Sequence, residues 1–346
     1  LTEEQEKVYF EELIENDEFE PPMNIPGTQN GWVPMGPFET FKQNTMQAIS
    51  WHKNIYAIDQ SLSNPNLLIC GTEAGGVYKT TDKALNWQLI SKGEVFSGSN
   101  AAVKIHPTDT NNFLLASNSR IYQSLDGGDN WIERHTTSGT GNEFQYAPSD
   151  DSLIYHTSSS GLFKSTNGGV TWSQIYTQSC WDIDFHPTDS AVAYLLKSNT
   201  TAVRCELFRS DDFGNSWTIK DSNWYEPTTL SAASINGGKI AVTDAAPDIV
   251  HVCLIGNSKA NDNGWIGMYK SSNRGEIWTD PDNQDGGPYY TINGSSPWNV
   301  AAYSSGYHQG YYNFDMEASQ SDSNLLFVAS IRLRDSTDGR QTFTPI

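Results

Sequence analysis

The stretch 280–312 gathers the side chains best suited to bind a ligand. Trp298, Tyr303, Tyr307 and His308 lie there among Asn, Ser and Gly residues. Aromatic rings stack on the faces of pyranose sugars, and neighbouring polar groups can hydrogen-bond the hydroxyls. The composition therefore predicts that these four residues contact a glycan. The alternative is that the rings pack this stretch against the rest of the fold.

Acidic residues open the same stretch. Asp280, Asp282 and Asp285 precede Gly286-Gly287 and could supply closely spaced oxygen ligands to Ca²⁺. Their spacing differs from that of the EF-hand loop, and a solvated acidic turn is the alternative. We expect no other cofactor, because the seven histidines are scattered and the cysteines lack zinc-site spacing.

The cysteines are too few to make a disulfide framework. There are four, and two of them lie within short apolar runs. Free buried thiols are the main expectation, since small thiols pack well in a core. A disulfide between Cys180 and Cys205 is the alternative, because both fall in one repeat of the chain. The four are Cys70, Cys180, Cys205 and Cys253.

A repeated motif must position these residues. It reads aromatic-x-[ST]-x-[DN]-x-G-x-x-[WF] and occurs six times, with closing aromatics 44, 41, 45, 61 and 65 residues apart. Repeats at a period of roughly 40–50 residues are typical of propellers and solenoids. Ser/Thr and Asp/Asn side chains can hold a tight turn, so the motif predicts structure rather than chemistry. Its acid or amide residues are Asp82, Asp126, Asn167, Asp212, Asn273 and Asp338.

A Pro/Asp turn precedes each motif, most clearly at His106-Pro107-Thr108-Asp109 and His186-Pro187-Thr188-Asp189. Each unit then contains four short antiparallel strands, which is the composition of a propeller blade. The sequence predicts an all-β β-propeller with at least six visible blades, six to eight in the complete ring. We expect the blades near residues 51–95, 98–137, 142–178, 181–222, 228–282 and 312–346.

The N-terminal stretch differs from the repeats. Residues 1–20 hold nine acidic residues and one lysine, and Pro21-Pro22 would end a short helix there. We divide the chain into an acidic leader helix or linker, 1–29, and the propeller, 30–346. Residues 30–50 are expected to supply a lone strand or a rim loop. If the chain ends at Ile346, we place that strand in the last blade, where it would close the ring. The chain starts at Leu1 and stops within a predicted strand, so we expect a longer parent protein.

The overall charge limits the classes of partner that the protein can bind. The net charge is −20, which would repel a phosphate backbone, so nucleic-acid binding is not expected. No apolar run approaches the ~18 residues that span a bilayer. A neutral polymer, a cation or a basic partner fits the charge.

The motif resembles the Asp-box, or bacterial neuraminidase repeat, of sialidase, xyloglucanase and sortilin propellers. Gly31-Trp32-Val33-Pro34-Met35-Gly36-Pro37, Gly75-Gly76-Val77-Tyr78 and Gly310-Tyr311-Tyr312-Asn313-Phe314-Asp315 are similar to segments of secreted Bacteroidota surface proteins. That resemblance implies export by the type IX system and a secreted or cell-surface location on a bacterium.

The resemblance also suggests enzymatic roles. The sialidase Arg-Ile-Pro motif is absent. An enzyme of the xyloglucanase type needs two catalytic carboxylates. Glu73 stands before Gly75-Gly76, at the position that resembles that of the family's acid, although the family has Asp there. Asp315 is the candidate for the second carboxylate. Asp182 and Asp184 are expected to point to opposite faces of one strand and therefore not to pair.

A binding function is the prediction that these observations favour. We expect a secreted or cell-surface propeller that recognises a glycan or a surface protein. A polysaccharide hydrolase that uses Glu73 and Asp315 is the alternative. A structural module of a larger surface or secretion assembly is the third hypothesis.

Overall fold

The computed structural model divides the chain into two compact units. One is Met35–Pro345, and the other contains Leu1–Pro34 and Ile346. The acidic leader predicted for residues 1–29 lies outside the described residues. The structure describes residues 40–41, 48–49, 54–73, 75–91, 96, 100–199, 204–222, 224, 234–257, 265–279, 302–304, 307–308, 314–330, 333–339 and 343–345.

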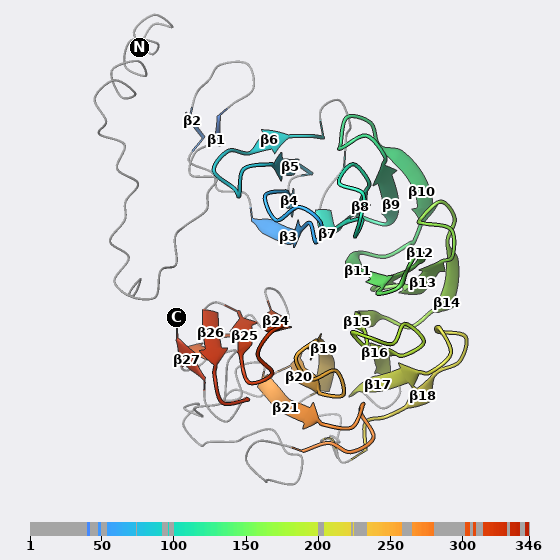
Figure 1. Cartoon of the computed structure of the whole chain (residues 1–346), viewed down its shortest axis with the longest axis vertical. Coiled ribbons are helices and arrows are strands. Elements are labelled where there is room, and N and C mark those ends of the chain that lie inside the picture. The colour runs from blue at the N-terminus through green and yellow to red at the C-terminus, as the bar shows by residue number, and fades with distance from the viewer. Residues whose placement is uncertain are drawn as a thin grey trace, which may run out of the picture. The chain divides into compact units, whose positions relative to one another are not determined.

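Within the described residues, six antiparallel sheets of three or four strands follow one another around a propeller ring (Figure 1). The first sheet contains β3 (Ile55–Gln60), β4 (Leu68–Thr72), β5 (Val77–Thr80) and β6 (Gln88–Leu89). The second contains β7 (Asn100–Ile105), β8 (Phe113–Ser117), β9 (Arg120–Ser124) and β10 (Ile132–Thr136). The third contains β11 (Gly141–Ala147), β12 (Asp150–Ser158), β13 (Gly161–Ser165) and β14 (Ser173–Tyr176).

The other three sheets repeat this order. The fourth contains β15 (Cys180–Phe185), β16 (Ala193–Asn199), β17 (Arg204–Ser210) and β18 (Thr218–Ile219). The fifth contains β19 (Ser234–Val242), β20 (Val250–Asn257) and β21 (Trp265–Ser271), with a bridge between Lys270 and Thr279 at its outer edge. The sixth contains β24 (Asp315–Ala318), β25 (Leu326–Ala329), β26 (Leu333–Ser336) and β27 (Thr344–Pro345).

The predicted propeller is therefore confirmed. Four of the six sheets fall within a predicted blade range, and the third and fourth begin one residue before theirs, at Gly141 and Cys180. The prediction that residues 30–50 close the last blade is wrong. The four strands of the sixth sheet all come from residues 315–345. Residues 40–49 instead supply β1 (Thr40–Phe41) and β2 (Ala48–Ile49), which pair with each other. A local hairpin can form without the long loop closure that a strand shared between the two ends requires.

Apolar clusters fill the junctions between successive sheets. Five buried clusters occupy the first to second, second to third, third to fourth, fourth to fifth and fifth to sixth junctions among the described residues. Large rings such as Trp131 and Trp172, which close two copies of the repeated motif, are buried in them. The aromatic end of each motif thus supplies apolar area where two sheets pack.

The repeated motif forms the same turn in all six sheets. The Ser or Thr hydroxyl donates to the acid or amide oxygen two residues later, at 2.7 to 3.0 Å. In the second sheet, Asp126 Oδ1 also accepts from Asn130 N at 2.9 Å, and Ser124 Oγ accepts from Gly128 N at 2.8 Å. These bonds lower the pKa of Asp82, Asp126 and Asp212 to about 2, with the side-chain partner four residues on contributing most.

The His-Pro turns are structural as well. His106 Nδ1 accepts from the backbone N–H groups of Thr108 and Asp109, at 3.2 and 3.1 Å. His186 Nδ1 accepts from Thr188 N at 3.4 Å. Both imidazoles therefore close the turn that leads into the second strand of their sheet.

The four cysteines are free and buried. The expectation of buried thiols is confirmed, and the alternative disulfide between Cys180 and Cys205 is absent. Burial raises the pKa of Cys70 to about 11 and that of Cys180 to about 12. Within the described part of the chain there is also no helix long and apolar enough to cross a membrane.

Candidate functional site: a charged central cavity

A cavity of about 470 Å³ lies at the centre of the ring. The first strand of every sheet contributes side chains to its wall, from β3, β7, β11, β15, β19 and β24. Successive residues of a strand point to opposite sides, so residues two apart line the cavity together. A volume of 300–1,000 Å³ is typical of ligand sites.

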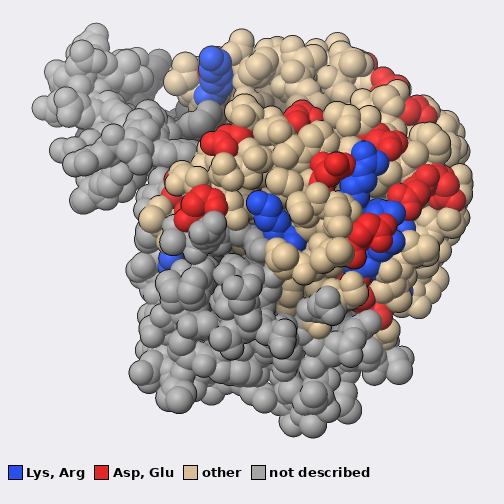
Figure 2. Space-filling view, turned by 60° about the horizontal axis from the view of Figure 1, so that its bottom comes forward, with Lys and Arg blue, Asp and Glu red and all other residues tan. Residues whose placement is uncertain are grey.

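Charged residues dominate this wall. Six carboxylates and two lysines line the cavity among the described residues: Asp59, Glu143, Asp182, Asp184, Asp315 and Glu317, with Lys104 and Lys239. These eight residues occupy two equivalent positions of the first strands, either two or four residues before the turn that leads to the second strand. Elsewhere, Figure 2 shows acidic and basic side chains interspersed over one face of the molecule.

Lys239 is the hub of the cavity. Its Nζ lies 3.4 Å from Glu143 Oε2, 3.6 Å from Asp182 Oδ1 and 3.4 Å from Asp315 Oδ1. These three acids belong to the third, fourth and sixth sheets, so one ammonium group on the fifth sheet connects four blades. On the other side of the ring, Lys104 Nζ lies 3.5 Å from Asp59 Oδ1.

Backbone N–H groups hold two of the carboxylates. Asp59 Oδ2 accepts from Ile105 N at 2.7 Å, and Asp182 Oδ2 accepts from Ile240 N at 2.5 Å. Each bond crosses to the first strand of the following sheet. Asp184 is held differently: Oδ1 accepts from Gln145 Nε2 at 2.8 Å. The acids thus fasten neighbouring sheets while they line the cavity.

The carboxylates differ in their pKa values. Burial raises the pKa of Asp184 to about 7, and the nearby Glu143 charge adds to the shift. Burial also raises the pKa of Asp182 well above its ordinary value, with Glu143 again contributing. Burial opposes ionisation of Glu143 too, but Lys239, Asp182 and Lys104 together hold its pKa below the ordinary value. The cavity therefore combines ionised and protonated acids near neutral pH.

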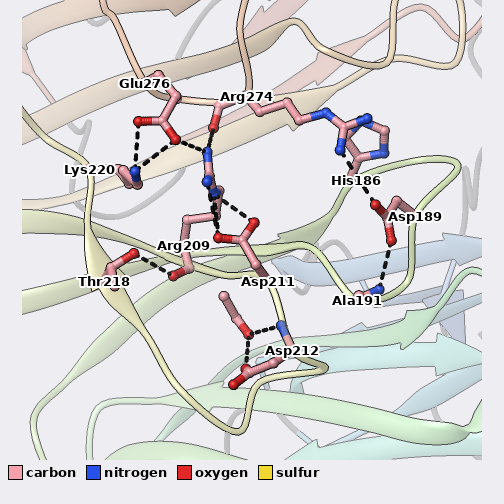
Figure 3. Close-up of polar contacts among 12 residues, drawn as sticks. His186, Asp189, Ala191, Arg209, Asp211, Asp212, Thr218, Lys220, Arg274 and Glu276 are labelled. Carbon is pink, nitrogen blue, oxygen red and sulfur yellow. Dashed lines mark hydrogen bonds and ion pairs between the residues drawn. The ribbon is translucent and has the colours of Figure 1, made fainter.

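A second charged cluster joins the fourth and fifth sheets near their turns (Figure 3). Arg209 Nη1 donates to Arg274 O at 2.8 Å and lies 2.8 Å from Glu276 Oε1. Arg274 Nε lies 2.5 Å from Asp248 Oδ1, which is 3.5 Å from His186 Nε2. Because these groups pair with one another across the junction, we assign them a structural role.

The predicted catalytic pair is divided between two places. Asp315 lines the cavity and lies beside Lys239. Glu73 follows β4, accepts from Asn54 Nδ2 at 2.8 Å and is not part of the cavity wall. The structure therefore does not bring both carboxylates into this cavity.

Most of the other predicted site residues lie outside the residues that the structure describes. Tyr303 belongs to β22 (Ala302–Ser304), and Tyr307 and His308 form β23 (Tyr307–His308), which pairs with β22. Trp298 lies outside the described residues, as do the candidate calcium ligands Asp280, Asp282 and Asp285. Among the residues that the structure describes, no three His, Cys, Asp or Glu side chains are placed to hold a metal ion. The calcium site stays a prediction.

Sequence reasoning missed the cavity. It set Asp182 and Asp184 aside as lying on opposite faces, which was wrong, because residues two apart along a strand share a face. Both line the cavity. The signal was available: in four repeats a charged residue stands two places before the turn residue, at Asp59, Lys104, Asp184 and Glu317. Which of these charges face each other depends on the ring, which the sequence does not specify.

Comparisons with known proteins agree with the fold. An ancestral GH74 enzyme superposes with a TM-score of 0.58 at 14% identity, covering 88% of this chain and 37% of that one. YCF48 bound to D1 peptide gives 0.51 at 12%, covering 85% of this chain and 82% of that chain. The Cps50 (Swd1) propeller domain of Myceliophteria thermophila gives 0.51 at 12%, covering 88% and 89%.

These likenesses show a β-propeller and nothing finer. No family model matches the chain, and no curated protein matches it in sequence. The chain spans just over a third of the length of the ancestral GH74 enzyme. The structures that it resembles include an enzyme and a propeller solved with a bound peptide.

Proposed function

We propose that this protein is a binding propeller that receives a cationic group of a peptide or protein partner in its central cavity. The observation that carries the proposal is the cavity wall, where six carboxylates face two lysines. Even with both lysines paired, the excess of acid favours a cation. The accessible acids are Asp315, whose side chain is 75% exposed, and Glu317 on the same strand.

A cation suits this wall better than a neutral group for a physical reason. Lysine and arginine donate several hydrogen bonds, and charge-assisted bonds to carboxylates are about twice as strong as neutral ones. The surrounding sheets lower the local dielectric, which strengthens the attraction. A structural neighbour supports the class of ligand, because YCF48 has been solved with a bound peptide.

The partner's setting is part of the proposal. We place the protein at a bacterial cell surface or outside the cell, where the partner would be a surface protein or a glycan. A glycan would contact Trp298, Tyr303, Tyr307 and His308 in addition to the cavity. A structural role within a larger surface assembly would use the same cavity to hold a neighbouring subunit.

Binding can be tested with small probes. Capped pentapeptides with a central arginine, lysine or citrulline differ in charge but little in shape. We expect the arginine and lysine peptides to bind with an affinity that falls as salt is added. Citrulline, the neutral isostere of arginine, should not bind. Equal binding of all three peptides would contradict the proposal, and binding of polysaccharides alone would favour a glycan.

A hydrolase is the second candidate, and the unequal carboxylates favour it. An acid that stays protonated near pH 7 beside an ionised one is the arrangement that glycosidases use. Asp184 and Glu143 meet that description. The test is release of reducing ends from plant, algal and host polysaccharides, with Glu73→Gln, Asp315→Asn and Asp184→Asn as controls. Release that one of these changes abolishes would establish catalysis.

A further inference from the structure

The wall of the central cavity has two levels, and the levels differ on the fifth sheet. The first strands of the fourth, fifth and sixth sheets, β15, β19 and β24, follow one another in the ring (Figure 1). The residues three places before the end of each strand are Asp182, Lys239 and Asp315. The residues one place before the end are Asp184, Ala241 and Glu317. We call these two sets the Lys239 level and the Ala241 level.

At the Lys239 level, a cation of the fifth sheet lies between acids of its two neighbours. Lys239 Nζ is 3.6 Å from Asp182 Oδ1 on the fourth sheet and 3.4 Å from Asp315 Oδ1 on the sixth. Charge-assisted contacts of this kind are stronger than contacts between neutral groups. The lysine therefore supplies the counter-charge for both neighbouring acids.

The Ala241 level repeats the two acids without the lysine. Asp184 and Glu317 line the cavity from the fourth and sixth sheets. Between them the fifth sheet contributes Ala241, which is buried and carries only a methyl group. The place that the Lys239 ammonium takes at one level thus has no cation of the fifth sheet at the other.

Neutral amides hold these two acids in position. Asp184 Oδ1 accepts from Gln145 Nε2 at 2.8 Å and from Phe185 N at 2.9 Å. Glu317 Oε1 accepts from Gln320 Nε2 at 3.3 Å. Within the part of the chain that the structure describes, Asp184 Oδ2 and Glu317 Oε2 accept no hydrogen bond. Each acid is therefore oriented through one oxygen and keeps the other for a donor.

The second lysine of the cavity does not supply the missing charge. Lys104 belongs to the second sheet, and its Nζ lies 3.5 Å from Asp59 Oδ1. Burial raises the pKa of both Asp184 and Glu317 to about 7, although Lys104 lowers each of them. The charge of Asp184 adds to the shift of Glu317. Two acids that oppose each other's ionisation favour a cation near both.

We infer that the cationic group of the ligand lies between Asp184 and Glu317, beside Ala241, in the place that corresponds to the Lys239 ammonium. This inference rests on the proposed cation-binding function and assigns the position of the cation within that cavity. The group is one primary ammonium or guanidinium on an alkyl stem. Ala57 and Ala102, which line the cavity on the first and second sheets, offer the stem a small apolar surface.

A lysine built into the chain should occupy this place. The second sheet already has Lys104 at the position equivalent to Ala241, so a first strand accommodates the side chain there. We expect Ala241→Lys to bind the arginine pentapeptide at least tenfold more weakly than the native protein at pH 8. Leu125→Lys adds the same charge in a turn of the second sheet, where Leu125 is 53% exposed, and should bind as the native protein does. Equal affinities of all three proteins would overturn the inference.

The pH dependence of stability checks the same variant without a ligand. In the native fold, the raised pKa values of Asp184 and Glu317 mean that stability is lost as the pH rises through about 7. A lysine between these acids lowers both pKa values, so Ala241→Lys should lose less melting temperature between pH 6 and pH 8. Ala241→Met has a side chain of similar length without the charge and should keep the native loss. Equal losses in the two variants would contradict the assigned place.

Proton release distinguishes this inference from the proposed function. Titration of the arginine peptide in two buffers of different ionisation enthalpy counts the protons released on binding. At pH 7 we expect the native protein to release about one proton, because the bound cation lowers the pKa of Asp184 and Glu317. Glu317→Gln keeps the size of the side chain and should release fewer protons and bind about tenfold more weakly.

The outcomes separate two kinds of failure. Peptide binding without proton release, and with the same affinity for Glu317→Gln as for the native protein, would leave the cavity as a binding site but overturn the place assigned to the cation. Failure of the peptide to bind the native protein would contradict the proposed function itself, and this inference with it. Because Glu317→Gln tests the place independently of Ala241→Lys, the test also holds if the lysine variant does not fold.

Discussion

Lys239 Nζ lies 3.6 Å from Asp182 Oδ1, across the junction between the fourth and fifth sheets. Asp182 is buried, and its other oxygen accepts from Ile240 N. The same ammonium group lies near Glu143 and Asp315. One cation thus compensates acids from three other sheets at the centre of the ring.

Removal of that cation should destabilise the ring. Lys239→Met keeps the length of the side chain but leaves Asp182 and Glu143 without their main counter-charge. We expect a loss of about 3 kcal/mol in the free energy of unfolding, as measured by urea denaturation. Lys220→Met removes an ion pair with the half-exposed Glu276 and should cost less than about 1 kcal/mol. Equal losses for the two variants would show that the cavity charges are no better coupled than surface ones.

Stability should be greatest at mildly acidic pH. The turn acids Asp82, Asp126 and Asp212 have pKa values of about 2 in the fold, below the ordinary 3.8, so their contribution is lost as the pH falls towards 2. Asp184 and Glu317 have pKa values of about 7, above the ordinary values of 3.8 and 4.5. Their protonated forms favour the fold, so that contribution is complete below about pH 4 and lost as the pH rises through about 7.

Measuring the melting temperature between pH 2 and pH 8 tests both effects, the loss of stability at low pH and the loss as the pH rises through about 7. Asp184→Asn keeps an oxygen for Gln145 and should flatten the fall between pH 4 and pH 7. Asp151→Asn removes an exposed acid from a different place and should leave that fall unchanged. A melting temperature that rises steadily from pH 4 to pH 8 would contradict the assigned pKa directions.

The acid of the repeated turn should be replaceable by its amide. Asn167 and Asn273 already accept the same two hydrogen bonds as Asp126 does in its turn. Asp126→Asn should therefore leave the melting temperature nearly unchanged, whereas Asp126→Ala should cost about 1 kcal/mol. If Asn is as damaging as Ala, the negative charge rather than the bonding geometry holds the turn.

Two glycines of this turn should differ in their tolerance of alanine. At Gly214 a Cβ would lie 1.6 Å from Tyr155 Oη, whereas at Gly168 it would meet nothing within 4 Å. Both have positive φ, but Phe213 and Arg274 adopt it at the position equivalent to Gly168. Gly168→Ala should cost about 1 kcal/mol through backbone strain alone. Gly214→Ala should cost about 3 kcal/mol, since Tyr155 must move. Denaturation curves of the two variants that coincide would contradict the close contact between Gly214 and Tyr155.

The fold could be predicted from the sequence because the features that determine each blade are local in the chain. Each repeat carries its own turn residues and apolar strands, so six copies such as those ending at Trp131 and Trp172 indicated the blades without any long-range contact. The charged cavity could not be predicted in the same way. Asp59 and Lys104 are 45 residues apart, and Lys239 approaches Glu143 from 96 residues away. Only the closing of the ring brings these side chains together.

The error over Asp182 and Asp184 has a different origin. Their shared face follows from strand geometry alone, so the sequence was sufficient and the inference was mistaken. The Glu73 assignment rested on a resemblance, and the structure places that residue on a turn beside Asn54. The strand predicted at the end of the chain is β27, which completes the sixth sheet beside β26.

The central claim is tested most directly by calorimetric titration of the arginine pentapeptide into the native protein, Asp315→Asn and Asp151→Asn at pH 7.5. The account predicts that Asp315→Asn weakens binding by about tenfold, because it removes an accessible cavity acid, while Asp151→Asn binds as the native protein does. It also predicts weaker binding to the native protein at pH 6, where Asp184 is protonated. Equal affinities for all three proteins would mean that the peptide binds elsewhere, and that the cavity is not the site.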